Sequence, residues 1–194
     1  MARKKTITRD QILNAAYEVV SKEGFSHFTA RNIAAKMKCS TQPIYLEFKN
    51  MEDLKQVLVK EIIDSLSEKF LDKEVTGNKL VDLGVNYIEF ANQEKQLYKA
   101  LYLEGEVGIA EMKEYSYEYF IDTVIKDSEY ESLDDERIKS IYTGFWIIVS
   151  GLAALTSSGI ITPNKDEVIK LLEKSFATMK EMRPVDISFK TLRF

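Results

Sequence analysis

The sequence contains little cysteine, proline and glycine, and each scarcity excludes a class of protein. A single cysteine, Cys39, excludes an intramolecular disulfide and any metal site built from several thiolates. Three prolines and eight glycines leave no linker or low-complexity tract, which favours long regular elements with short connections. Residues 1–9 are basic but lack the apolar stretch of a signal peptide, so we expect a cytoplasmic protein.

Signatures of catalysis are missing too. The chain has no glycine-rich phosphate loop, no serine or cysteine beside a candidate base, and no Glu-x-x-His pair. His27 is the only histidine, and a lone histidine cannot form a metal site without carboxylate partners. We therefore expect no enzyme, no cofactor and no metal site.

Charge is absent from one long run, between Lys139 and Lys165, which is long enough to span a bilayer. The run also contains serines, threonines and glycines, and amphipathic segments surround it. A membrane span remains an alternative. We favour a helix buried on nearly all sides by its own domain and by a partner, in a protein without membrane association.

The charges that are present divide unevenly along the chain. Residues 1–60 hold eleven Lys and Arg against six Asp and Glu, a net charge of +5, and the remaining residues carry −9 of the chain's overall −4. A basic segment beside an acidic body indicates that only one end meets a polyanion. Chance segregation of solvated charge is the alternative.

Apolar residues recur at helical spacing throughout and predict an all-α protein. At the N-terminus the pattern predicts helices at 8–22, 30–37 and 41–48, and a fourth that starts after Asn50. Thr8, Thr29, Ser40 and Asn50 are the expected N-caps, and Gly24 the expected end of the first helix.

Further helices are expected at 78–92, 94–104, 107–126, 135–158 and 165–181. The predicted domains are a three-helix DNA-binding domain at 1–50, a larger helical ligand-binding and dimerisation domain at 51–182, and a tail at 183–194. An extended and a disordered tail both remain open.

The second and third helices, joined by a tight turn, have the form of a helix-turn-helix, whose second helix enters the DNA major groove. Gln42 on that helix can pair bidentately with adenine, and flanking basic residues can contact phosphate. Ordinary solvated surface is the alternative for each. The predicted DNA-binding residues are Thr29, Arg31, Lys38, Ser40, Thr41, Gln42, Tyr45 and Lys49.

In combination, these residues resemble the N-terminal pattern of the TetR family of bacterial repressors over residues 8 to about 60. The matching residues are Thr29, Ile33-Ala34, Cys39-Ser40, Ile44-Tyr45, Phe48, Asn50 and Leu54, preceded by Ile12-Leu13, Ala15-Ala16 and Gly24-Phe25. The resemblance implies a homodimer on a palindromic operator in double-stranded DNA, with the Tyr45 hydroxyl near phosphate.

Two positions depart from the family pattern. Met37-Lys38 replaces Ala-Gly, so the turn lacks its glycine, and Met51 replaces a phosphate-binding lysine. We expect Lys49 and the N–H groups at the start of the fourth helix to replace that contact. Farther along, Trp146 to Leu152 is similar to a Trp-x-x-x-His-Gly element of one subgroup, with Ser150 in place of the histidine.

The last two helices resemble the family's dimer-forming pair. The interface residues expected from their apolar stripes are Ile141, Phe145, Ile148, Leu152, Leu155, Leu172 and Phe176. Aromatic residues at helical spacing are usually core, yet tyrosine hydroxyls and apolar rings also suit an effector pocket. The predicted pocket residues are Tyr87, Phe90, Tyr98, Tyr102, Tyr119, Phe120 and Trp146.

The function predicted from the sequence is a DNA-binding transcriptional regulator that resembles TetR repressors and is released by an unknown small-molecule effector. The effector would change the separation of the two recognition helices through the fourth helix. The alternative is a helical protein-interaction or dimerisation module without effector binding.

Overall fold

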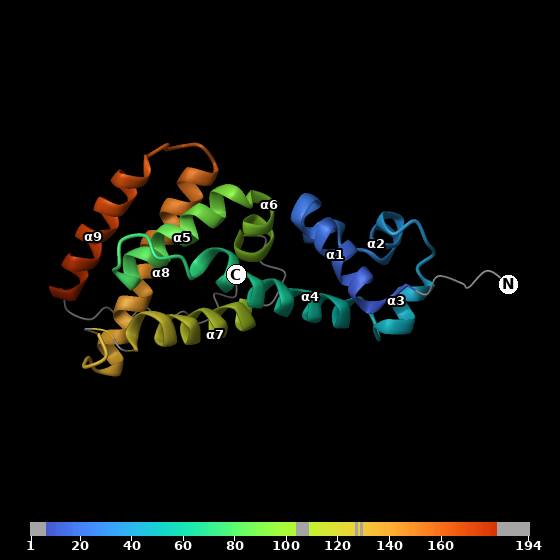
Figure 1. Cartoon of the computed structure of the whole chain (residues 1–194), viewed down its shortest axis with the longest axis horizontal. Coiled ribbons are helices and arrows are strands. Elements are labelled where there is room, and N and C mark those ends of the chain that lie inside the picture. The colour runs from blue at the N-terminus through green and yellow to red at the C-terminus, as the bar shows by residue number, and fades with distance from the viewer. Residues whose placement is uncertain (1–6, 104–108, 127, 129, 182–194) are drawn as a thin grey trace, which may run out of the picture. The chain divides into compact units, whose positions relative to one another are not determined.

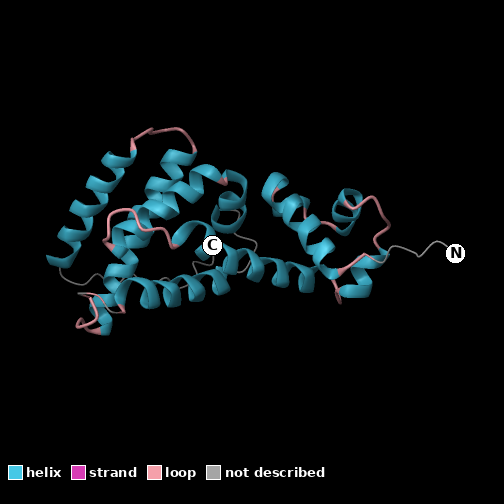
Figure 2. Ribbon diagram, in the orientation of Figure 1, coloured by secondary structure: helices cyan, strands magenta, loops and turns pink. Residues whose placement is uncertain are grey.

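The computed structural model describes residues 7–103, 109–126, 128 and 130–181. Within these residues the regular structure is helical and no β-strand occurs, which confirms the predicted fold class (Figures 1 and 2). The α-helices are α1 (Arg9–Glu23), α2 (Ala30–Lys36), α3 (Gln42–Glu47), α4 (Met51–Leu66), α5 (Lys79–Gln93), α6 (Lys95–Tyr98), α7 (Ile109–Phe120), α8 (Asp135–Ser157) and α9 (Lys165–Glu181).

The chain folds as two compact units. The first contains the described residues of Met1–Glu68 and Glu94–Ala110, and the second contains those of Lys69–Gln93 and Glu111–Phe194. The first passage of the chain between them falls in a π-helical turn, Ser67–Leu71, directly after α4. The domain limits at residues 50 and 182 remain a prediction, because a compact unit is not the same thing as a functional domain.

Side-chain caps fix where the N-terminal helices begin. The Thr8 hydroxyl accepts a hydrogen bond from the Gln11 amide, and the Gln11 side chain accepts one from the Thr8 amide, at 3.3 and 3.1 Å. The Thr29 and Asn50 side chains cap α2 and α4, and each accepts a hydrogen bond from the amide three residues later. Each cap pairs an N–H group that the helix itself leaves without a partner, so these three predicted starts are confirmed.

Helix α1 is the centre of the first unit. Its apolar face buries Ile12, Ala16, Val19 and Val20 completely, and the helix packs against α2, α3, α4 and α6. The spacing of these residues is helical, so one face of α1 meets all of its neighbours. The short helices α2 and α3 are therefore held on a common support.

Helix α5 has the corresponding place in the second unit. Every residue from 80 to 88 is buried, and the helix packs against α8 and α9. A Cβ atom on Gly84 would lie 3.0 Å from Leu172 Cδ1 and 3.2 Å from Val149 Cγ1. The missing side chain thus allows the three helices to approach one another closely.

Helix α8 is long and apolar enough to cross a membrane by length and composition, a test that the core helix of a soluble protein also passes. One face of α8 buries Ile138, Ile141, Phe145 and Val149, and the helix packs against α5 and α9. The expected burial of α8 within its own domain is therefore present along this face.

The segment that follows α4 is fastened to the second unit by side chains. The buried Asn86 of α5 donates hydrogen bonds to the carbonyl oxygens of Leu71 and Lys73, at 3.0 and 2.7 Å. Between them, the Asp72 carboxylate accepts a hydrogen bond from the Tyr119 hydroxyl of α7. Helices α5 and α7 therefore hold the chain directly after the helix that leaves the first unit.

Candidate nucleic-acid interface

The turn between α2 and α3 contains a backbone conformation that L-residues rarely adopt. Lys38 has a φ of 54°, the only positive φ outside glycine among the described residues. The amide of Lys38 donates to the Ala35 carbonyl and that of Cys39 to the Ala34 carbonyl, each at 3.1 Å. A left-handed residue is thus needed where the TetR pattern has glycine, and here a lysine supplies it.

Helix α3 is short and is fixed from its inner side. Ile44 and Phe48 are buried to 0% and 2% exposure, and the Arg9 guanidinium lies 4.7 Å from the centroid of the Phe48 ring. Pro43 stands in the first turn, where a missing N–H group costs little. The prediction that Ser40 caps this helix is wrong, because Thr41 has the N-cap position and its side chain makes no capping hydrogen bond.

The outward face of α3 is accessible. Gln42 is exposed, Tyr45 is 54% exposed and Leu46 is 76% exposed. Of the eight residues predicted to bind DNA, seven are exposed, and Thr41 is half-buried. Thr29 also caps α2, which leaves its hydroxyl engaged within the protein. Contacts of these side chains with DNA remain predictions.

The start of α4 has a reciprocal arrangement of its own. The Asn50 side chain accepts a hydrogen bond from the Asp53 amide, and the Asp53 carboxylate accepts one from the Lys49 amide, both at 2.9 Å. Two of the backbone N–H groups near this helix start are therefore paired within the protein. The exposed Lys49 ammonium remains the predicted substitute for the phosphate contact that Met51 lacks.

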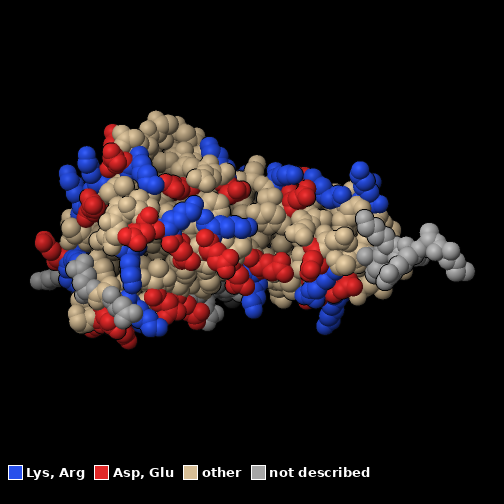
Figure 3. Space-filling view, in the orientation of Figure 1, with Lys and Arg blue, Asp and Glu red and all other residues tan. Residues whose placement is uncertain are grey.

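Lys36, another basic residue of this region, forms an ion pair within the protein. The Lys36 ammonium lies 3.0 Å from a carboxylate oxygen of Glu23 and ties α2 to the end of α1. The hydrogen bond and the positive charge of Lys36 hold the pKa of the Glu23 carboxyl below its usual range. On the face shown in Figure 3, basic and acidic side chains are interspersed, so this face presents no large patch of one sign.

The predicted effector residues fall into both units. Tyr98 and Tyr102 belong to the first unit, where their rings stack 5.6 Å apart. In the second unit, Tyr87 packs edge-on against Trp146 at 5.1 Å, and Phe90 and Phe120 are buried. These rings fill space as a core does, and their role in binding an effector remains a prediction.

Tyr142, which is not among the seven predicted pocket residues, completes the aromatic cluster of the second unit. Its ring meets those of Tyr117 at 5.0 Å and Phe120 at 5.3 Å, and its hydroxyl lies 2.7 Å from the Ser116 hydroxyl. Burial raises the pKa of the Tyr142 phenol above its usual value. Core residues share its helical spacing from Phe145 and Trp146, so periodicity alone does not mark Tyr142 as a pocket residue.

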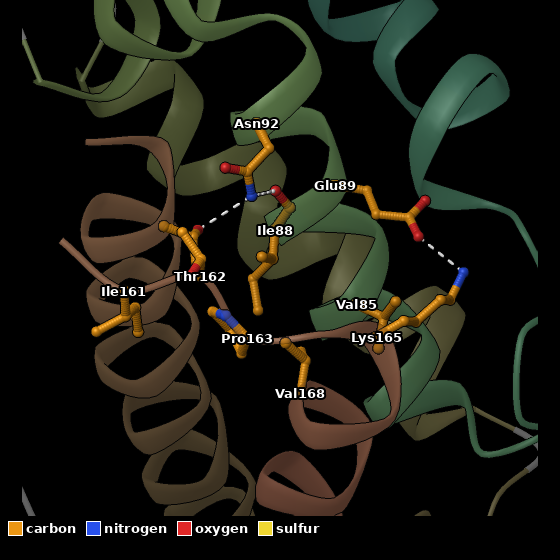
Figure 4. Close-up of a pocket in the computed structure, with 10 residues that line it drawn as sticks. Val85, Ile88, Glu89, Asn92, Ile161, Thr162, Pro163, Lys165 and Val168 are labelled. Atoms are coloured by element: carbon orange, nitrogen blue, oxygen red, sulfur yellow. Dashed lines mark hydrogen bonds and ion pairs between the residues drawn. The ribbon is translucent and has the colours of Figure 1, made fainter. Parts of the chain in front are cut away.

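A pocket of about 330 Å³ lies elsewhere in the second unit, between α5 and the segment that joins α8 to α9 (Figure 4). Its walls include Ile88, Ile161 and Val168, and none of the seven predicted effector residues lines it. At its edge, Glu89 and Lys165 form an ion pair at 2.7 Å (Figure 4). Sequence patterning gave no signal for this pocket, because loop residues supply part of its lining.

The residues predicted for a dimer interface separate into two groups. Ile141, Phe145, Leu172 and Phe176 are buried within the protomer, and their place in a dimer interface remains a prediction. Ile148 and Leu152 are half-buried, and Leu155 is 38% exposed. The exposed apolar residues beside them are Ile147 on α8 and Leu171 on α9, at 53% and 46%. An apolar stripe contains both a core side and an outer side, which periodicity alone does not separate.

Comparison with known proteins supports the resemblance over the first part of the chain. Residues 12–57 match the family model for bacterial regulatory proteins of the tetR family, which confirms the expected resemblance to that family over nearly the same range. No curated protein sequence matches the chain.

Solved structures extend the likeness to the whole fold. A putative TetR-family transcriptional regulator from Vibrio parahaemolyticus is 17% identical, with a TM-score of 0.63 over 87% of this chain and 96% of that one. The fatty acid degradation regulator FadR from Bacillus halodurans is 20% identical, with a TM-score of 0.57 over 91% and 96%. FadR from Bacillus subtilis, in complex with stearoyl-CoA, is 19% identical, with a TM-score of 0.55 over 89% and 97%. At these identities the likeness establishes the fold.

Proposed function

We propose that this chain, whose residues 12–57 match the tetR-family model and whose fold is similar to that of TetR-family regulators, is a cytoplasmic, homodimeric repressor that an effector releases from operator DNA. The observation that carries the proposal is the outward face of α3. This face exposes Gln42, Tyr45 and Leu46 while Ile44 and Phe48 anchor the helix from behind. A rigid helix with an exposed polar and aromatic face suits the major groove.

A two-fold dimer would place two copies of α3 about 35 Å apart, one turn of B-DNA, on a palindrome. We assign the interface to the outer side of α8 and α9, centred on Ile147, Leu155 and Leu171. Exposed apolar groups of this size on two adjacent helices are a surface that a second copy can bury.

For the effector we propose a small apolar or aromatic molecule bound in the second unit. Bacillus subtilis FadR was solved with stearoyl-CoA, so a protein of this fold has room for an extended apolar ligand. In this chain the hydrogen bonds of Asn86 and Tyr119 to residues 71–73 could transmit a change in the second unit to the chain that follows α4. An effector acts only through the difference in its affinity for the two states.

The test begins with selection of bound sequences from random duplex DNA, at a stated salt concentration. The proposal predicts a palindromic motif, and an affinity that falls as salt rises because neutralised phosphates release counterions. Sedimentation at micromolar concentration should give twice the chain mass, and Ile147→Lys should give the monomer. The alternative of a protein-interaction module predicts a folded dimer that selects no DNA sequence.

Effector binding needs a separate measurement. Hydrophobic and cationic compounds would be screened by thermal shift, since a ligand at 100 times its dissociation constant stabilises the fold by about 2.7 kcal/mol. Each hit would then be tested for release of the protein from the selected operator. Hits that stabilise the protein without weakening its DNA complex would contradict the proposed release.

A further inference from the structure

Leu46 is the most exposed large apolar side chain in the described part of the protein, at 76%. Its neighbour Tyr45, at 54%, is another of the seven large apolar side chains that are exposed there, so two of the seven lie on a helix of six residues. Single apolar residues at a surface are common and need no explanation. Two adjacent exposed apolar side chains on the helix proposed to enter the DNA groove do need an explanation.

The direction of the Leu46 side chain follows from helix geometry. Leu46 stands two residues after Ile44 in α3, and at about 100° per residue it points about 160° away from Ile44. Ile44 and Phe48 are buried against the rest of the unit. Leu46 is therefore the side chain that projects farthest from the core, and in a groove it would reach deepest.

The major groove offers few apolar groups to such a side chain. Base edges there present donors and acceptors, and the 5-methyl group of thymine is the apolar exception. A leucine set against donors and acceptors would leave them without partners, at a cost in affinity. Against a methyl group it removes apolar surface from water on both sides.

We propose that Leu46 is a specificity-determining residue that recognises the 5-methyl group of a thymine in each half-site of the operator. Gln42, one turn earlier on the same face, fixes where that thymine lies. Four residues advance about 6 Å along α3, nearly two base-pair steps of about 3.4 Å, so the thymine lies one or two base pairs from the base that Gln42 contacts. This proposal rests on the proposed DNA-binding function.

The test removes the methyl group alone. In the operator selected with the full-length protein, each thymine is replaced in turn by deoxyuridine, which keeps base pairing and all donors and acceptors. When the sensitive thymine is replaced in one half-site, the affinity of the wild-type protein should fall about fourfold. When it is replaced in both half-sites, the affinity should fall about fifteenfold. These are the factors expected for one and two buried methyl groups. Replacement of the other thymines should have little effect.

The matched variants are Leu46→Ala and, as a control, Ile160→Ala, whose side chain is 71% exposed in the second unit. Leu46→Ala should bind the thymine operator more weakly and should no longer distinguish thymine from deoxyuridine at the sensitive position. Ile160→Ala should distinguish them as the wild type does. Both side chains are exposed, so melting temperatures should stay close to that of the wild type.

The outcomes separate this proposal from the proposed function. If a motif is selected but no thymine is sensitive, or if Leu46→Ala keeps the full sensitivity, the role of Leu46 is refuted while DNA binding stands. If no motif is selected at all, the proposed function itself fails. A methyl effect that is lost only in Leu46→Ala establishes the contact.

Discussion

Helices α3 and α8 place their apolar side chains in opposite ways. The six-residue α3 exposes Tyr45 and Leu46 and is held by two buried residues, Ile44 and Phe48. The 23-residue α8 buries seven side chains and exposes Ile147 and Leu155 on its outer side. The short helix thus exposes apolar side chains to solvent, and the long helix buries most of its apolar side chains in the core of the second unit.

This difference separates two kinds of energetic effect. A side chain that meets nothing in the folded protein contributes little to the free energy of unfolding, so a change there should be felt only on DNA. A side chain in the core of the second unit contributes to stability first. When they are compared at constant protein concentration, substitutions in one region should change stability and those in the other should change DNA binding.

The largest effect is expected at Phe145. Its ring contacts those of Phe120 and Phe176, each at a centroid distance of 5.6 Å, and the side chain is 2% exposed. Phe145→Ala should lower the free energy of unfolding by about 3–5 kcal/mol, because it removes packed apolar surface and leaves a cavity. Urea denaturation followed by circular dichroism measures this value.

Tyr45→Ala is the counterpart on α3. Tyr45 is 54% exposed, so we expect a change in unfolding free energy within about 0.5 kcal/mol, together with weaker DNA binding. Equal losses of stability at the two positions would break the comparison. A Phe145→Ala protein that dissociates to stable monomers would support the interface role predicted from its sequence pattern.

Two glycines give a second contrast, of intermediate size. Gly84→Ala places a Cβ atom 3.0 Å from Leu172 Cδ1, and we expect a loss of about 1–3 kcal/mol from overpacking. Gly151 has no such neighbour within 4 Å, so Gly151→Ala should raise stability by up to about 1 kcal/mol through helix propensity. Thermal unfolding of both variants decides the point, and a stabilised Gly84→Ala protein would show that α5 does not need its close approach.

A small effect on stability is expected in the turn of the helix-turn-helix. Lys38 occupies a left-handed conformation that costs an L-residue roughly 1–2 kcal/mol, and glycine removes this cost. Glycine also gives the unfolded chain more conformational entropy, which offsets about 0.4–1 kcal/mol of the gain. Lys38→Gly should therefore stabilise the protein by up to about 1 kcal/mol. If Lys38 also contacts phosphate, the same variant should bind DNA more weakly with a shallower salt dependence.

Lys38→Ala is the control for Lys38→Gly, because it removes the charge and keeps the backbone strain. It should leave stability near that of the wild type and weaken DNA binding to the same extent as Lys38→Gly. A stabilised Lys38→Ala protein would mean that charge rather than backbone conformation sets the stability at this position.

The helices of the first unit could be predicted closely from the sequence because the signals for their starts are local. Thr8, Thr29 and Asn50 each form their cap with a residue three positions later, so four consecutive residues determine where each helix starts. The family's glycine is missing at Lys38, and this turn position has a positive φ in the structure. The cap of α3 was misplaced by one residue, because Ser40 and Thr41 are both suitable capping residues.

The second unit was predicted as a set of helices but not as a site. The segment expected as one helix at 94–104 includes a π-helical turn at Lys99–Leu103, and the segment expected at 107–126 includes another at Ile121–Ile125. Whether an aromatic ring such as Phe90 fills a core or lines a pocket depends on which helix faces it. That information is long-range, and helical spacing does not contain it.

Base recognition by the outward face of α3 is the central claim, and the sequence preference of Gln42→Ala tests it most directly. The preference would be measured by selection from random duplex DNA beside the wild type, at one salt concentration, with Lys49→Ala as a phosphate-contact control. The account predicts that Gln42→Ala loses its preference at one base position per half-site, at a cost of about 1–3 kcal/mol, while Lys49→Ala weakens all sequences nearly alike. An unchanged motif and an unchanged affinity in Gln42→Ala would contradict the account.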